Sequence, residues 1–388
     1  YTKGTGISAI GKTTDSCTMW NRATTCQITL PSITALTGYG VDGWYNSSNT
    51  KVGTEGTKVN VNTDKTTYTA KGKANSYTLT YNYNGATGGN STTSKAVTYG
   101  GAYGTLPSPT RSYVVTYNYN SATGGNTTAN ATSNYTFNGW YKESTFTNQV
   151  TSSTIYNTVG NSTIYAKWTG TSIVLPTPTR TGYTFSGWYS DSSFTNKVGN
   201  AGSSYTPTSS LTLYAKWIIN SYNVTYNYSQ NGGTSATKTT ATVNYGSSID
   251  LSTTATKAGW TFVGWNTNKD ATVGLTSLNM STSNVTLYAI FKKTINVSYT
   301  KGTGISAIGK TSDSCVMYNN ATSCQITLPS ITALTGYGVD GWYNSSNTKV
   351  GTEGTRVNVS GNITYTAKGK ANSYTLTYNY NGATGGNS

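Results

Sequence analysis

A short phrase ending in Gly-Trp recurs along this chain and limits what the chain can fold into. Its copies occupy residues 38–44, 134–140, 182–188, 259–265 and 336–342, so the Trp residues are spaced by 96, 48, 77 and 77 residues. A second phrase, Tyr-Ala-Lys-Trp or a variant of it, follows each copy, and a Tyr-rich phrase opens most units. Recurrence of this kind indicates an array of small modules that contact mainly their neighbours.

The chain also contains a much longer repeat, which includes several of these phrases. Residues 1–91 return almost unchanged as residues 299–388, with one residue deleted near position 63. The sixteen residues 76–91 therefore reappear as residues 373–388. Such high sequence identity between the two copies suggests recent duplication of a large block. We therefore expect the chain to be one part of a longer array.

Local patterns in the opening phrase favour strands. Larger side chains fall at every second residue of 77–83, the period of a half-buried strand, and Asn84-Gly85 supplies turn residues after it. The Pro-containing stretches 106–109 and 175–178 are predicted to be extended connectors, because Pro lacks the donor that a central strand needs. Segments with helical period are scarce, so the sequence predicts a mainly β protein. Modules of about 75 residues, each about 30 Å across, would form an elongated rod.

Composition bears on partners and location. Only 10% of residues are charged, yet the net charge is +15, with the 26 Lys and Arg scattered along the chain. This charge serves general solubility or attraction to anionic cell-surface polymers and glycans. Specific nucleic-acid binding is not expected, because no basic cluster exists. The chain has no apolar stretch of about 18 residues, so no membrane span is predicted. No signal peptide opens the chain, so any export signal is expected to lie outside it.

The chain offers little for catalysis. It has no His and only 11 acidic residues, which excludes Ser-His-Asp and Cys-His arrangements. Asp42, Asp340, Glu55 and Glu353 each recur within their own module type without a second acid nearby, and we interpret them as exposed turn residues. We therefore predict no catalytic, cofactor-binding or metal-binding residues, no cofactor and no enzymatic activity.

Cysteines occur as two pairs with identical spacing. Cys17 and Cys26 bracket eight residues, as do Cys315 and Cys324, and there are no others. This pattern predicts two local disulfides and an oxidising compartment. A reduced or zinc-bound pair is the alternative, although two thiolates without His make an incomplete zinc site.

The recurring aromatic residues have two interpretations. Repetition at one register is typical of a core position, so we predict that one Trp anchors each module core. These are Trp44, Trp140, Trp188, Trp265 and Trp342. The alternative is an exposed face on which sugars stack. Tyr81, Tyr117 and Tyr226, on alternating strands, are the better candidates if a glycan is bound.

The stretch 175–217, LPTPTRTGYTFSGWYSDSSFTNKV followed by LTLYAKW, resembles the Listeria–Bacteroides repeat, also called the internalin B-repeat. These modules stand in tandem on bacterial surface proteins. The resemblance implies a β-grasp-like fold for each module and offers weak support for mucin or receptor binding. It is looser over 1–73 and 295–371. An extra strand phrase within 110–134 departs from the family pattern.

Together these features predict the following organisation. Residues 1–73 form a Cys-containing module, 74–168 an enlarged repeat, 169–217 a short repeat, 218–294 a further repeat, 295–371 a second Cys-containing module, and 372–388 the start of another repeat. The expected function is a structural segment of an extracellular bacterial surface fibre, filament or adhesin stalk. The alternative is a set of glycan- or mucin-binding adhesin modules.

The closing phrase 374–380 has the alternation of a half-buried strand but no module around it. Alone it would present an unpaired edge. We expect it to pair within a continuing chain or to be donated to a further copy of this chain.

Overall fold

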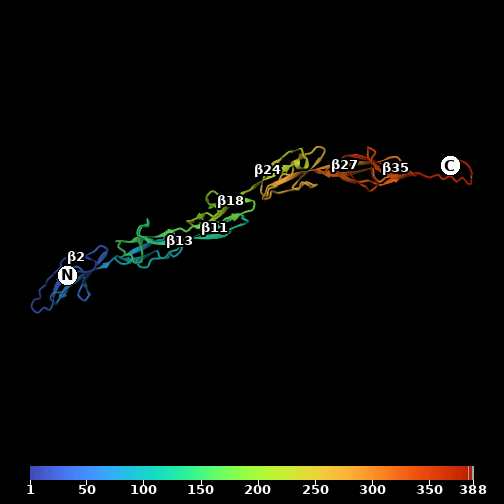
Figure 1. The fold of residues 1–388 in the computed structure, drawn as a ribbon. Coiled ribbons are helices and arrows are strands. Elements are labelled where there is room, and N and C mark those ends of the chain that lie inside the picture. The colour runs from blue at the N-terminus through green and yellow to red at the C-terminus, as the bar shows by residue number, and fades with distance from the viewer. Residues whose placement is uncertain (383, 387–388) are drawn as a thin grey trace. The chain divides into compact units, whose positions relative to one another are not determined.

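The structure is a computed structural model that describes residues 1–382 and 384–386 (Figure 1). Its described part is almost entirely strands and loops, with one short 3₁₀ helix, η1 (Ser229–Asn231). The prediction of a mainly β protein is confirmed. Among the described residues, no helix is long and apolar enough to cross a membrane.

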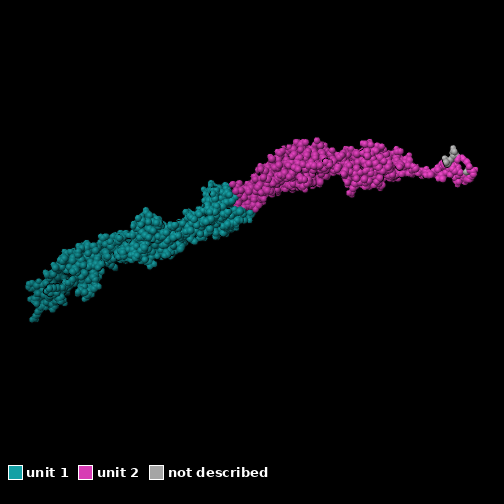
Figure 2. Space-filling model, in the orientation of Figure 1, with its two compact units in different colours: residues 1–179, 185–216 teal, residues 180–184, 217–388 magenta. Residues whose placement is uncertain are grey.

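Two compact units divide the chain (Figure 2). Unit 1 comprises residues 1–179 and 185–216, and unit 2 comprises residues 180–184 and 217–388. Both are built from one strand arrangement that occurs in five versions, which we call repeats 1 to 5.

Repeat 4, in unit 2, shows this arrangement most simply. Its opening strand β22 (Ser221–Asn227) pairs antiparallel with β24 (Thr240–Asn244) on one side and parallel with β27 (Val285–Lys301) on the other. β26 (Thr261–Asn266) then pairs antiparallel with β27. Numbered along the chain, the order across the sheet is 2-1-4-3, with parallel strands 1 and 4 at the centre, which fits a β-grasp-like sheet without its helix. A small ladder joins β23 (Ser235–Ala236) to β25 (Ala255–Thr256).

Repeat 5 continues from repeat 4 through β27 itself. The first half of β27 is strand 4 of repeat 4, and the second half is strand 1 of repeat 5. Its other strands are β28 (Ile305–Ile308), β29 (Ser312–Tyr318), β30 (Cys324–Thr327), β31 (Ile331–Ala333), β32 (Tyr337–Tyr343), β33 (Lys349–Gly351), β34 (Arg356–Val359) and β35 (Ile363–Ala371). The main sheet runs β29-β27-β35-β32-β33, and β28-β31 and β30-β34 form two small ladders.

Repeat 1, in unit 1, has nearly the same sequence as repeat 5 but a smaller sheet. Its main sheet runs β1-β8-β5-β6, and the pairs β2-β4 and β3-β7 form small ladders. The strands are β1 (Thr2–Lys3), β2 (Ile7–Ile10), β3 (Cys26–Thr29), β4 (Ile33–Ala35), β5 (Tyr39–Tyr45), β6 (Lys51–Gly53), β7 (Lys58–Val61) and β8 (Thr69–Ala74).

Repeats 2 and 3 are interlaced along the chain. Repeat 2 takes its first two strands from β9 (Ser76–Asn82) and β10 (Ser94–Thr98). Its last two are the second half of β13 (Asn130–Tyr141) and β15 (Ser162–Thr169), with β14 (Gln149–Val150) at the edge. Between these two halves the chain builds the opening hairpin of repeat 3, from β11 (Arg111–Asn118) and the first half of β13.

Repeat 3 is completed only after repeat 2 has closed. β11 pairs in parallel with β21 (Leu211–Ile219), and β18 (Tyr183–Tyr189) and β19 (Lys197–Gly199) follow in the sheet. A small ladder joins β12 (Gly124–Gly125) to β17 (Pro178–Thr179), and another joins β16 (Ile173–Val174) to β20 (Ser204–Tyr205). The extra strand phrase within 110–134, which the sequence places in an enlarged module of residues 74–168, therefore pairs with residues of the predicted short module 169–217. The predicted domain boundaries themselves stay a prediction.

The Gly before each anchoring Trp has a steric reason. Gly43 has φ 149°, and a Cβ atom there would lie 2.6 Å from the carbonyl oxygen of Gly53. The register shifts between Val41 and Gly43, so the strand carries a β-bulge at this point. Gly264 and Gly341 repeat the same φ and bulge. A bulge redirects the side chain that follows it, which here is the Trp that enters the core.

The predicted strand at 374–380 is not formed in the described structure. The identical residues 77–83 lie almost wholly in β9, because β10 and β15 pair with the two edges of that strand. Residues 374–380 are exposed and have no paired strand among the described residues. The alternating sequence thus specifies a strand only where partner strands are present.

Candidate functional site

The five Trp residues lie at the centres of the five repeats. Their exposed fractions are 0% for Trp44, Trp188, Trp265 and Trp342 and 2% for Trp140. Each indole N–H donates to a backbone carbonyl: Pro31 for Trp44, Pro107 for Trp140, Pro176 for Trp188, Thr253 for Trp265 and Pro329 for Trp342, at 2.7–2.9 Å. All five Trp residues therefore lie in the cores of their repeats, where the sequence analysis expects core anchors.

The glycan-stacking alternative is wrong for Tyr81, Tyr117 and Tyr226. Their exposed fractions are 6%, 6% and 2%, because their strands are central ones and turn these rings into the core. Each ring packs against the Trp of its own repeat, with centroid distances of 5.2 Å for Tyr81–Trp140, 5.1 Å for Tyr117–Trp188 and 5.1 Å for Tyr226–Trp265. A sugar cannot stack on a ring whose faces are already covered by protein.

Burial also changes how these phenols titrate. Desolvation raises the pKa of Tyr81, Tyr117 and Tyr299 to about 12, with a smaller contribution from neighbouring phenols or acids. The folded state therefore favours the neutral phenol. The stability this gives is fully present below the unfolded pKa of about 10 and is lost as the pH rises through the folded pKa.

We expect alkaline unfolding between pH about 10 and about 12, with tyrosinate formation in two groups. The measurement is absorbance at 295 nm during a pH titration, with and without denaturant. In denaturant the buried Tyr should ionise near pH 10, whereas in the native protein they should ionise only at higher pH. A single titration near pH 10 in the native protein would contradict the burial of these rings.

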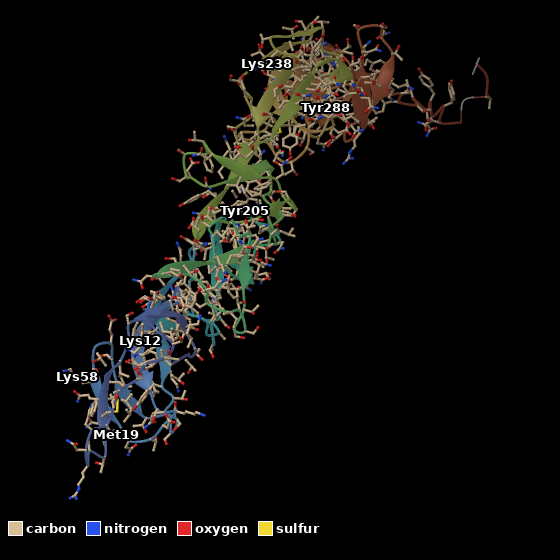
Figure 3. All side chains as sticks on the ribbon, turned by 90° about the vertical axis from the view of Figure 1, so that its left-hand side faces the viewer. Lys12, Met19, Lys58, Tyr205, Lys238 and Tyr288 are labelled. Atoms are coloured by element: carbon tan, nitrogen blue, oxygen red, sulfur yellow. A yellow bond between two sulfur atoms is a disulfide. The ribbon has the colours of Figure 1, made fainter. Side chains whose placement is uncertain are left out.

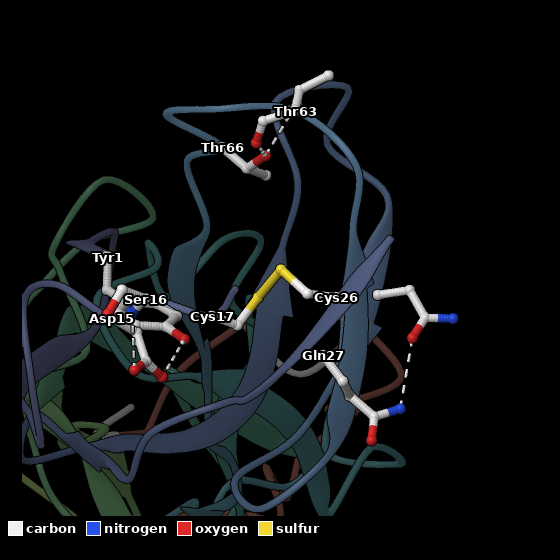
Figure 4. The surroundings of a disulfide bond; sticks show 9 residues. Tyr1, Asp15, Ser16, Cys17, Cys26, Gln27, Thr63 and Thr66 are labelled. Carbon is white, nitrogen blue, oxygen red and sulfur yellow. Dashed lines mark hydrogen bonds between the residues drawn. A yellow bond between two sulfur atoms is a disulfide. The ribbon is translucent and has the colours of Figure 1, made fainter. Parts of the chain in front are cut away.

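Both predicted disulfides are present. Cys17 is bonded to Cys26 and Cys315 to Cys324, and no described cysteine is free. Figure 4 shows the first bond, with Cys26 at the start of β3, which pairs with β7. In repeat 5, the second bond joins β29 of the main sheet to β30 of a small ladder. Each bond therefore closes a short loop at the edge of its repeat.

Removing either disulfide should lower the free energy of unfolding of its repeat by about 2.7 kcal/mol, on the chain-entropy model for a loop of about ten residues. The paired substitutions Cys315→Ser and Cys324→Ser test this by denaturant unfolding. Reductant should destabilise the unsubstituted chain and leave this repeat of the variant unchanged. Intact-mass measurement after alkylation supplies the direct check, and four free thiols in native material would contradict the assignment.

The acidic residues do not assemble into a reactive group. Asp42 accepts from the Tyr45 hydroxyl at 2.8 Å and from the Lys51 ammonium at 3.1 Å, and these bonds lower the pKa of its carboxyl group. Asp340 has the same two kinds of partner in repeat 5. Glu55 and Glu353 are exposed. Within the part of the chain that the structure describes, no group of three His, Cys, Asp or Glu could hold a metal ion.

The Lys of the closing phrase has a structural partner. Lys167 lies over the ring of Tyr141 at 5.1 Å, and Lys216 lies over that of Tyr189 at the same distance. In repeats 1 and 5, Lys71 and Lys368 lie over Tyr45 and Tyr343 and also donate to Asn49 and Asn347. Part of the basic charge is therefore committed to cation–π contacts that hold the strand-3 turn onto strand 4.

The core role of the Leu-Pro steps is a structural feature that the sequence analysis did not predict. Leu30, Leu175 and Leu328 are each 1% exposed, and the Pro after each accepts the indole N–H of the anchoring Trp. The Pro stands 12 or 13 residues before its Trp in repeats 1, 3 and 5, but Pro107 stands 33 residues before Trp140. That extra length is the signal of an insertion within repeat 2.

Comparison with known proteins agrees with this architecture. The sequence model of the Listeria-Bacteroides repeat domain matches residues 77–115, 112–167, 169–216, 222–290 and 296–368. A putative Gly-rich membrane protein of Evansella cellulosilytica is 30% identical over 200 residues, which cover 47% of this chain and 22% of that protein. Internalin H of Listeria monocytogenes is 37% identical over 95 residues, which cover 23% of this chain and 16% of that protein. The chain thus spans about a fifth of the length of these relatives.

The matched segments begin at residue 77, but residues 1–74 repeat the sequence of residues 299–371, most of which is matched. The family match and the recurring 2-1-4-3 sheet with its buried Trp lead to one assignment. The chain belongs to the Listeria–Bacteroides repeat family.

Proposed function

We propose that this chain is a structural segment of an extracellular bacterial surface protein, in which tandem β repeats serve as a stalk or fibre shaft. The observation that carries the proposal is the sharing of strands between repeats. β27 runs from repeat 4 into repeat 5, and β13 belongs to both repeat 2 and repeat 3. A shared strand with its backbone hydrogen bonds, rather than a flexible linker, therefore joins these neighbours, as a shaft that transmits tension requires.

The use of the aromatic residues supports the same proposal. The Trp and Tyr residues that could have bound sugars instead fill the cores, one Tyr–Trp pair to each of repeats 2, 3 and 4. One relative is named as an internalin and the other as a putative membrane protein, and both names support a cell-surface location. The two disulfides suit an oxidising environment. The second candidate, a glycan- or mucin-binding adhesin, rests on the charge of +15 and the exposed Trp20.

Small-angle X-ray scattering of the full chain tests the shaft proposal. Five modules of about 30 Å arranged in line would give a maximum dimension on the order of 150 Å. A much shorter dimension would contradict a shaft. Saturable binding to mucin or to an acidic glycan, abolished by Trp20→Ala, would favour the adhesin alternative.

A further inference from the structure

In repeat 2, a polar cleft lies along the part of β15 that β13 does not reach. Tyr141 and Tyr165 form the last residue pair of these two strands, so residues 162–164 are paired with β9 alone among the described strands. The cleft has a volume of about 430 Å³, which is within the range typical of small-molecule pockets. Its polar lining comprises Tyr103, Lys142, Glu143, Asn161, Ser162 and Thr163.

Repeat 4 supplies a matched comparison, because its strands have the register of repeat 2. Tyr288, labelled in Figure 3, corresponds to Tyr165, since each is paired with the Asn that ends its strand 1. Val285 therefore corresponds to Ser162, so an inward position that is apolar in repeat 4 carries a hydroxyl in repeat 2. The Ser162 hydroxyl is buried and has no hydrogen-bond partner among the described residues. A ligand that paired with it would relieve an unfavourable burial.

Two further core positions differ in the same way. Tyr103 and Tyr156 stand where repeat 4 has Ile249 and Met280, because the backbone N–H groups of these residues make matching bonds to the facing loop. The two Tyr rings pack edge to face, with their centroids 5.5 Å apart. The hydroxyl of Tyr103 has no partner among the described residues, although the ring itself is buried. This end of repeat 2 therefore carries hydroxyls where repeat 4 has apolar side chains.

A carboxylate, an ammonium and an amide complete the lining. The side-chain and backbone N–H groups of Asn148 donate to the two oxygens of Glu143 at 2.8 and 3.1 Å, and these bonds lower the pKa of its carboxyl group. Lys142 adds one positive charge, so the two charges of the cleft cancel. Asn161 accepts the Thr78 N–H through Oδ1 at 2.8 Å. Its amide N–H groups, which have no partner among the described residues, are left to donate.

We propose that this cleft of repeat 2 binds a neutral sugar residue. Sugar hydroxyls both donate and accept, and the cleft presents both kinds of partner. A carboxylate has about four acceptor sites, so Glu143 can accept sugar hydroxyls beside the two bonds from Asn148. The same carboxylate repels an anionic sugar. The inference does not depend on the proposed shaft function, because one repeat of a shaft can carry a sugar as well as one repeat of an adhesin.

Saturation-transfer difference NMR on the full chain tests the proposal. Glucose, galactose, mannose and N-acetylglucosamine serve as neutral probes, and N-acetylneuraminic acid serves as the anionic probe. At least one neutral probe should bind with a Kd of about 1 mM, as expected for a ligand of this size, and should slow hydrogen exchange in residues 158–165. The anionic probe should bind at least about tenfold more weakly. Failure of every neutral probe to bind, or preference for the anionic one, would overturn the proposal.

Ser162→Val separates a binding role from a structural one, because Val is the residue that repeat 4 has at this position. It should weaken sugar binding at least about tenfold while residues 162–169 exchange as slowly as before or more slowly. Glu143→Gln should weaken binding by a similar factor. Asp191→Asn, at the matching turn of repeat 3, and Trp20→Ala should leave binding unchanged. Unchanged binding in both Ser162→Val and Glu143→Gln would locate the sugar elsewhere and overturn the proposal.

Discussion

Replacing Trp188 by Ala is expected to lower the free energy of unfolding of repeat 3 by about 3–5 kcal/mol. Trp188 is fully buried, its indole N–H donates to Pro176 at 2.9 Å, and its ring contacts Tyr117 and Tyr119 at centroid distances of 5.1 and 5.3 Å. The substitution therefore leaves a cavity where the two halves of this repeat meet and an unpaired carbonyl beside it. Chemical denaturation followed by hydrogen exchange in residues 211–217 measures the effect on this repeat alone.

Trp20→Ala is the matched control, because Trp20 is 75% exposed and its loss opens no cavity. Its effect should stay within about 0.5 kcal/mol, as for ordinary surface substitutions. If Trp188→Ala left the exchange of residues 211–217 unchanged, Trp188 would not be a core anchor.

Much of this architecture could be predicted from short-range sequence patterns. Alternation in residues such as 77–83 predicts a strand because side chains of a strand point to alternate faces, and β9 covers most of that stretch. Cysteine spacing predicts two local disulfides, since a pair repeated in two copies with no other cysteine leaves few pairings. Recurrence of Trp at one place in each module predicts a core position, where the structure puts all five.

The interpretation of Tyr81 as a residue on which a glycan stacks failed because a local pattern does not show what covers a strand. Alternation shows that one face of a strand is apolar, but it does not show whether protein or ligand covers that face. Tyr81 lies on β9, which has β10 on one side and β15 on the other, and only this pairing makes the strand central. The partner β15 begins some 80 residues later, and a local pattern contains no information about it.

The interlacing of repeats 2 and 3 could not be predicted either, because local patterns contain no information about which distant strands pair. The distance from Pro107 to Trp140 indicates an insertion, but strand phrases are so alike that the sequence does not show which sheet the inserted hairpin joins. The structure decides it through packing. The buried core of repeat 2 draws on Leu79, Tyr81 and Trp140, and its members come from residues 79–103 and 140–166, on both sides of the hairpin.

Excising residues 112–134 should therefore unfold repeat 3 and spare repeat 2. Arg111 and Tyr135 are directly opposite each other in the β11–β13 pair, and the Arg111 guanidinium lies 4.6 Å from the Tyr135 ring centre. Paired strand residues have Cα atoms about 4.5–5.5 Å apart, so a peptide bond can join the cut ends after a small shift. The strands of repeat 2 on either side of the cut, β9, β10 and β15, remain complete.

Repeat 3, in contrast, loses both strands of its opening hairpin. Val115 and Tyr117, with exposed fractions of 0% and 6%, leave its core, and β21 loses its parallel partner β11. Hydrogen exchange should accelerate by at least about a hundredfold in residues 211–217, while residues 162–169 stay protected. The double substitution Val115→Ala and Tyr117→Ala, made in the uncut chain, is the matched control and should loosen repeat 3 selectively in the same way. If residues 183–217 stayed protected after the excision, 169–217 would be a self-sufficient module and the two repeats would not be interlaced.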